Sequence, residues 1–173
     1  MGYTTEFTGI GFWTDRPLQR EHIMFLLMFN RTRHLLYKAD DILPGPTRSL
    51  VETPVGPPDW HILADDLIRP GAEFRHGIVG PQLPSLDNNR TPEGIPGLWC
   101  GWTVNSDGNI TWDRNDKFYR YIEWLNHLIS TYLMPWGYKL NGTMSYKGED
   151  EDDFGRIIVV DNEVTKICLW GGE

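Results

Sequence analysis

The sequence predicts an α+β domain with a ferredoxin-like β-α-β-β-α-β core, one additional C-terminal strand and a long proline-rich insertion. Three observations support this class: a period-two strand pattern near the N-terminus, helical patterns that alternate with strand patterns, and ten of the twelve prolines gathered in residues 39–97. The 173 residues fit one domain, residues 1–173, because a chain of this length buries enough surface to form a core.

The first expected element is a strand over residues 3–12. Tyr3, Thr5 and Phe7 alternate with polar residues, which is the pattern of a strand with one apolar and one polar face. Gly9 and Gly11 indicate a bulge or close packing near the end of this strand.

A helix is expected next. Thr14 and Asp15 are suitable capping residues, and Pro17 fits the first turn. Residues 23–29 are apolar on every side, so this helix should be covered by more than a sheet alone. We expect it to end between residues 34 and 38.

The insertion, residues 39–97, is rich in proline and glycine. A connection of this length without secondary structure is unusual in a compact domain. Trp60, Phe74 and several aliphatic residues favour an ordered flap over a linker, with a short helix or turn expected at residues 60–68.

A β-hairpin follows the insertion. Residues 97–105 form the first expected strand, residues 106–109 contain an Asp-Gly turn signal, and residues 110–113 form the returning strand.

The second helix should begin near Asp113 or Asn115 and end before Pro135 and Gly137. Its apolar residues recur at helical spacing: Phe118, Ile122, Leu125, Ile129 and Tyr132.

Two further strand patterns complete the chain, at residues 138–148 and 156–170. The acidic run at residues 149–153 lies in an expected turn over residues 149–155. We expect this turn to be solvated, because the spacing of the acidic residues does not match that of an EF-hand loop. Asp161 and Asn162 predict another turn within the last segment.

Because the two helices should cover only one face of the sheet, alternation assigns each strand residue to a side. The side away from the helices is rich in threonine and also carries a carboxylate and an indole, which together can stack on and hydrogen-bond a planar polar ligand. An ordinary solvated sheet face explains the same pattern, since threonine is a good strand former. The candidate ligand-binding residues are Thr4, Glu6, Thr8, Arg90, Trp99, Thr103, Asp113 and Thr143.

Composition argues against several classes of protein. A formal net charge of −8 disfavours a protein held to nucleic acid by phosphate neutralisation. No stretch has membrane-spanning length and apolarity, and the N-terminus lacks a signal-peptide pattern, so we expect a soluble protein of the cytoplasm. Cys100 and Cys168 lack metal-ligand spacing, and no motif indicates a cofactor or a metal ion. Cys100 is expected to be buried and inert, with a catalytic nucleophile as the alternative.

Several motifs of this chain resemble those of a family of uncharacterised bacterial and phage proteins. They are GYTTEFTG, PEGIPGLWCGW, KFYRYIEWLNHLI, PWGYKLNGTMSYKGED and GRIIVVDNEV, which cover both ends of the chain and little of the insertion. The resemblance implies a small accessory protein of a phage or mobile element, present in the host cytoplasm if phage-encoded, and carries no activity with it.

Three functions remain open at this stage. The first is non-catalytic binding of a small polar ligand, for example a nucleotide signal, on the open sheet face. The second is inhibition or assembly through binding to a host protein, with exposed aromatic residues as anchors. The third is a small nucleotide hydrolase with Glu6 or Asp113 as general base. Because no catalytic motif is present, the sequence favours a binding protein over an enzyme.

Overall fold

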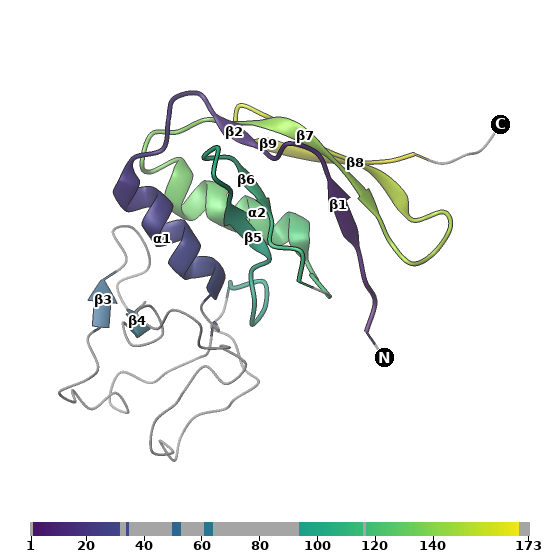
Figure 1. Cartoon of the computed structure of the whole chain (residues 1–173), viewed down its shortest axis with the longest axis horizontal. Helices are drawn as coiled ribbons and strands as arrows, with labels where there is room; N and C mark the ends of the chain where they lie inside the picture. The colour runs from purple at the N-terminus through teal and green to yellow at the C-terminus, as the bar shows by residue number, and fades with distance from the viewer. Residues whose placement is uncertain are drawn as a thin grey trace, which may run out of the picture.

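The computed structural model describes residues 2–31, 34, 94–115 and 117–169, and the backbone of two short strands in the insertion. Within these residues it contains two α-helices and antiparallel sheets, which confirms the α+β class (Figure 1). The elements, in chain order, are β1 Glu6–Thr8, β2 Trp13–Thr14, α1 Arg20–Arg31, β3 Leu50–Glu52, β4 His61–Leu63, β5 Trp102–Val104, β6 Ile110–Trp112, α2 Tyr121–Leu128, the π-helical turn η3 Ile129–Leu133, β7 Leu140–Lys147, β8 Phe154–Val160 and β9 Glu163–Cys168.

The main sheet is built around β7. Both β1 and β2 pair with β7 on one side, β8 pairs with its other side, and β9 follows β8, all antiparallel. The predicted N-terminal strand is therefore divided in two. Gly9 and Gly11, with φ angles of 139° and 94°, adopt backbone conformations that other residues rarely reach, and they interrupt the strand where a bulge is expected.

One face of the main sheet is covered by the helices and by the β5–β6 hairpin, which form a layer beneath it in Figure 1. An aromatic cluster joins the two layers. The Phe7 ring on β1 lies 5.2 Å from the Trp102 ring on β5 and 4.9 Å from the Tyr121 ring on α2, measured between centroids. Trp102 and Trp124 are fully buried, so tryptophan supplies the centre of the core.

The ferredoxin-like topology is not confirmed. In that topology the hairpin strands would lie in the same sheet as the first and last strands. Here β5 and β6 form a separate two-stranded sheet, joined to the N-terminal segment by an isolated bridge between Phe12 and Ile110. The strand that pairs with the free side of β7 is β8. The hairpin lies outside the main sheet and packs Trp102 against Phe7 of β1.

Side-chain alternation along the strands agrees with the prediction. Met144 and Tyr146 of β7 are buried, whereas the intervening Thr143, Ser145 and Lys147 are exposed. The same pattern holds for Phe7 between Glu6 and Thr8 in β1. A strand with one buried and one exposed face is typical of an antiparallel sheet covered on one side.

The predicted start of the first helix is wrong. Thr14 pairs with Leu140 in the sheet, and Asp15 binds Lys139 twice, through its backbone N–H and through its carboxylate. These residues therefore extend the sheet, and α1 begins at Arg20.

The predicted start of the second helix is also wrong. Asp113 and Asn115 lie in a loop, and α2 begins at Tyr121 after Arg120, whose φ of 54° is left-handed. Arg114 and Lys117 in the same loop are also left-handed, and each such residue costs about 1–2 kcal/mol relative to a right-handed conformation. The helix ends, as expected, before Pro135, with η3 as its last turn.

The insertion lies largely outside the described residues. Its backbone is described at β3 and β4, which pair antiparallel, so residues 61–63 form a strand where a helix or turn is expected. The prediction of a single domain with a flap over residues 39–97 stays a prediction.

Candidate functional site

The main sheet has a second face, which the helices and the hairpin do not cover. We call it the outer face. Its residues follow from the strand register, which aligns Thr8, Ser145, Arg156 and Ile167 in one row across the sheet. The outer face comprises Glu6 and Thr8 of β1, Trp13 of β2, Asn141, Thr143, Ser145 and Lys147 of β7, Phe154, Arg156, Ile158 and Val160 of β8, and Glu163, Thr165 and Ile167 of β9, with Leu169 just beyond.

The outer face is more apolar than a solvated sheet face requires. Trp13 is 44% exposed, Val160 is 58% exposed, and Ile167 and Leu169 are each 40% exposed. β8 is apolar on both sides, because buried Ile157 and Val159 alternate with Ile158 and Val160 on the outer face. Strands that are apolar on both sides are usually buried on both sides.

Arg156 occupies the middle of this apolar surface. It lies between Ser145 on β7 and Ile167 on β9 in the register. Among the residues that the structure describes, the Arg156 guanidinium forms no ion pair with a carboxylate. The ion pair in this part of the chain joins Arg120 and Glu123, away from the outer face. An exposed Arg among aliphatic side chains is a composition typical of protein interfaces.

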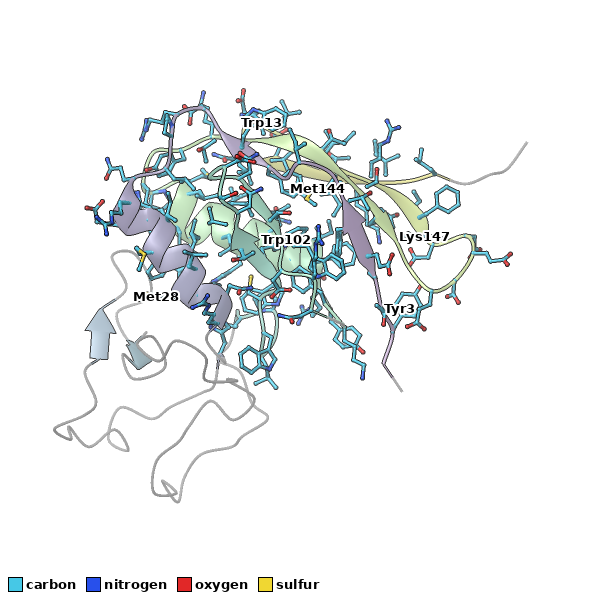
Figure 2. The ribbon with its side chains drawn as sticks, viewed as in Figure 1. Tyr3, Trp13, Met28, Trp102, Met144 and Lys147 are labelled. Carbon is cyan, nitrogen blue, oxygen red and sulfur yellow. The ribbon has the colours of Figure 1, made fainter. Side chains whose placement is uncertain are left out.

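Three of the predicted site residues lie together on the outer face: Glu6, Thr8 and Thr143. Glu6 is directly opposite Lys147, which is labelled at the far end of β7 in Figure 2. Thr4 lies before β1, where its backbone N–H donates to the Glu149 carboxylate at 2.6 Å. That contact ties the N-terminal segment to the acidic turn.

The other predicted residues do not join this group. Thr103 belongs to the hairpin and Trp99 to the segment before it, on the covered side of the main sheet, where Figure 2 shows Trp102. Asp113 is structural, because its carboxylate accepts hydrogen bonds from the Asn30 side chain at 2.8 Å and the Asn115 backbone at 2.9 Å. Arg90 lies outside the described residues.

A second feature, which the sequence did not reveal, is a groove along α2. It has a volume of about 440 Å³. We call it the α2 groove, and its lining residues are Gly94, Ile95, Pro96, Arg120, Glu123, Asn126, His127 and Ser130. The polar residues at positions 120, 123, 126, 127 and 130 lie on one side of the helix. In the sequence they have the pattern of an ordinary solvated helix face opposite an apolar stripe, so the pattern does not indicate a groove.

The geometry around the α2 groove is unusual in two ways. Left-handed Arg120 donates from Nη1 to the Pro96 carbonyl at 2.9 Å, which holds the segment before the hairpin against the helix. At the other end the helix widens into η3, where the Met134 N–H donates to the Ile129 carbonyl. Strained backbone and π-helical turns both occur frequently at functional sites.

Burial lowers the pKa of His127, at the inner side of the groove, to about 4. Its Nδ1 lies 3.4 Å from the Thr131 hydroxyl. The imidazole is therefore neutral at pH 7, which suits it to hydrogen bonding with a polar ligand.

Cys100 is buried, as predicted, and burial raises the pKa of its thiol, which disfavours the nucleophilic thiolate. The acidic run at residues 149–153 is an exposed turn between β7 and β8, also as predicted. Within the described ranges, no group of three or more His, Cys, Asp or Glu side chains is arranged to hold a metal ion. No helix in this part of the chain has the length and apolarity needed to span a bilayer.

A scan against protein-family models and searches of curated proteins and of solved structures each returned no match. The resemblance to bacterial and phage proteins therefore stays a prediction that rests on the quoted motifs.

Proposed function

We propose that this chain is a non-catalytic binding module that docks a protein partner on the outer face. The observation that carries the proposal is the exposure of apolar side chains on β8 and its neighbours, Val160 and Ile167 among them. Exposed apolar surface rimmed by polar residues marks interaction sites on soluble proteins. A flat sheet face suits a protein better than a small molecule, because small ligands are enclosed by concave sites.

The composition of the outer face defines the partner's chemistry. Trp13, Ile158 and Val160 call for an apolar contact surface. Arg156 calls for a carboxylate within that surface, because an arginine that is desolvated without a partner lowers affinity. If the resemblance to phage proteins holds, the partner is a host protein.

Variants at exposed positions on the outer face, compared with one exposed position elsewhere, test the proposal. The full chain is immobilised, the bound partner is identified, and its affinity is measured for Trp13→Ala, Arg156→Glu and, as control, Met134→Ala. Met134 is exposed on the helix side of the molecule. An interface anchor contributes at least about 2 kcal/mol, so Trp13→Ala should weaken binding roughly 30-fold and Met134→Ala should leave it unchanged. Equal affinity of all three variants and the parent chain would exclude the outer face as the site.

A second candidate function is binding of a small polar ligand, for example a nucleotide, in the α2 groove. The concave shape of the groove and its guanidinium, carboxylate, carboxamide and hydroxyl groups favour this function. A thermal-shift screen against nucleotides tests it, since a ligand at a hundred times its Kd adds about 2.7 kcal/mol of stability. The shift should disappear in Asn126→Ala and persist in Trp13→Ala. Loss in the second variant alone would move the ligand back to the sheet.

The hydrolase hypothesis has the least support. Asp113 holds structural hydrogen bonds, and Glu6 lies on the opposite side of the main sheet from it. Nucleotide turnover that is lost in Glu6→Gln would nevertheless establish an enzyme.

A further inference from the structure

The two edges of the main sheet differ in how they are protected. At the first edge, Phe12 and Ile110 exchange two backbone hydrogen bonds of 2.7 Å, so the hairpin caps the sheet beside β2. β1 is only three residues long and is followed by left-handed Gly9. Short edge strands and covered edges are devices that prevent further strand pairing.

The second edge is β9, which within the described residues pairs with β8 alone. The turn before it places Asp161 and Asn162 at φ angles of 46° and 74°, as in a type I′ hairpin, and Val160 faces Glu163 across it. At the far end, the Leu169 N–H donates to the Phe154 carbonyl at 2.9 Å.

Along β9, residues whose backbone groups bond to β8 alternate with residues whose backbone groups do not, and this alternation determines which N–H and C=O groups face the open edge. Glu163, Thr165 and Ile167 bond to β8, in step with Leu169. The N–H and C=O groups of the alternate residues therefore point away from the sheet, along the open edge. These residues are Val164, Lys166 and Cys168.

The side chain that usually guards such an edge is directed elsewhere. A lysine on an edge strand discourages pairing when its charge projects outward. The Lys166 ammonium instead reaches back across the sheet, 4.5 Å from the Tyr146 ring centroid on β7 and 5.1 Å from that of Tyr121 on α2. Its charge is thereby kept away from the edge, and the paired segment of β9 contains neither proline nor a bulge.

We propose that β9 pairs antiparallel with β9 of a second copy of this chain, around a twofold axis perpendicular to the sheet. Such an axis places the outer faces of both copies on the same side of the combined sheet. Each outer-face residue of β9 must therefore pair with an outer-face residue of the second β9. A register centred on Ile167 places it opposite Ile167 of the second copy, and Thr165 opposite Leu169. The groups that bond across the axis are those of Lys166 and Cys168.

Two neighbouring registers fit less well. Centring on Thr165 sets the Glu163 carboxylate against Ile167, and centring on Lys166 sets Thr165 against Ile167 and Glu163 against Leu169. Neither register sets two apolar side chains of the outer face opposite each other, and such apolar pairs stabilise a strand pair. The Ile167 register is therefore the self-complementary one, and it joins two outer faces into a continuous surface.

A charge-swap experiment on the full chain tests both the pairing and its register. Sedimentation velocity over a range of concentrations should show a dimer of the parent chain. Ile167→Lys alone and Ile167→Glu alone should each be monomeric, because like charges meet at the axis. An equimolar mixture of the two should recover the dimer as a heterodimer. The control Thr8→Lys, exposed on the outer face at the protected edge, should dimerise like the parent.

Amide hydrogen exchange supplies a second measurement, which locates the pairing at individual residues of β9. In the dimer the amides of Lys166 and Cys168 should exchange slowly, and in Ile167→Lys they should exchange fast. The backbone amide of residue 167, which faces β8, should remain slow in both proteins and so reports that the sheet is intact. A monomeric parent chain, or variants that dimerise separately, would overturn the pairing. A mixture that stays monomeric would overturn the register.

Discussion

Asn30 fastens α1 to the hairpin, and its removal tests how the covered layer is held together. Its side-chain N–H₂ donates to the Cys100 carbonyl and to the Asp113 carboxylate, both at 2.8 Å. Asn30→Ala removes both donors and leaves a carboxylate and a carbonyl half-buried.

The magnitude follows from the type of each bond. A neutral hydrogen bond contributes about 0.5–1.5 kcal/mol and one to a charged group about 1.5–3 kcal/mol. Because Asn30 and Asp113 are only partly buried, the lower halves of these ranges apply, for a loss of about 2–3 kcal/mol. For a chain of this length the loss corresponds to a decrease in Tm of roughly 4–12 °C. Asn30→Asp should cost more, because it turns an acceptor toward Asp113.

Denaturant unfolding of Asn30→Ala, Asp113→Ala and the double variant measures the coupling between the two side chains. We expect a coupling energy of about 1 kcal/mol, in the usual range for residues in contact. Arg31→Ala, at the neighbouring exposed position, serves as the control. A loss below about 0.5 kcal/mol in Asn30→Ala would refute the reasoning, since surface substitutions already reach that size. So would additive single variants.

Further predictions concern pH, packing and backbone conformation. Burial lowers the pKa of His34 to about 3, so the unfolded chain binds a proton below about pH 6.5 that the folded chain does not. Stability should therefore fall from pH 6.5 toward pH 4 by up to about 1.4 kcal/mol per pH unit from this residue, and urea titrations of His34→Gln should show a shallower decline. Gly101→Ala places a methyl group 2.6 Å from the Phe118 ring, so it should cost about 1–3 kcal/mol in thermal unfolding, while Gly108→Ala meets no neighbouring atom but strains a φ of 78°. Arg114→Gly should stabilise the chain by about 0.5–1 kcal/mol, because Arg114 is exposed and left-handed with a φ of 64°; a lower Tm for this variant would contradict it.

Local patterns in the sequence predicted local structure well. Alternation placed Met144 and Tyr146 inside and Thr143 and Ser145 outside, since these positions depend only on the pleat of the strand. The hairpin turn at residues 106–109 was recognised from Asp-Gly, whose glycine is left-handed in the structure.

Pairing between distant strands could not be predicted in the same way. Nothing in the residues near Trp99 and Thr103 indicates that their hairpin stacks under β1 instead of joining its sheet. That choice depends on the fit of Trp102 against Phe7 and Phe12, which are remote in sequence. The helix starts were misjudged for a related reason, because Asp15 and Asp113 are good caps in isolation and are engaged instead by Lys139 and Asn30.

The outer face was expected and its chemistry was not. Threonines drew attention to β1 and β7, whereas the apolar residues that distinguish the surface lie on β8 and β9. An apolar run such as residues 157–160 is equally consistent with a strand covered on both sides, and only the sheet order shows that one side is open.

The pairing of β1 with β7 has a consequence for the order of folding. Phe7 and Tyr146 are neighbours in the sheet although roughly 140 residues separate them, so joining them closes a long loop and is slow compared with forming the β7–β9 meander. We expect the meander, which is built from adjacent segments, to assemble first and the N-terminal strand to arrive last. In the folded chain Tyr3 donates a 2.6 Å hydrogen bond to Asp153, which holds this strand in place. Until that step one edge of β7 is unpaired, and we expect a nascent chain to be most prone to incorrect strand pairing at this edge.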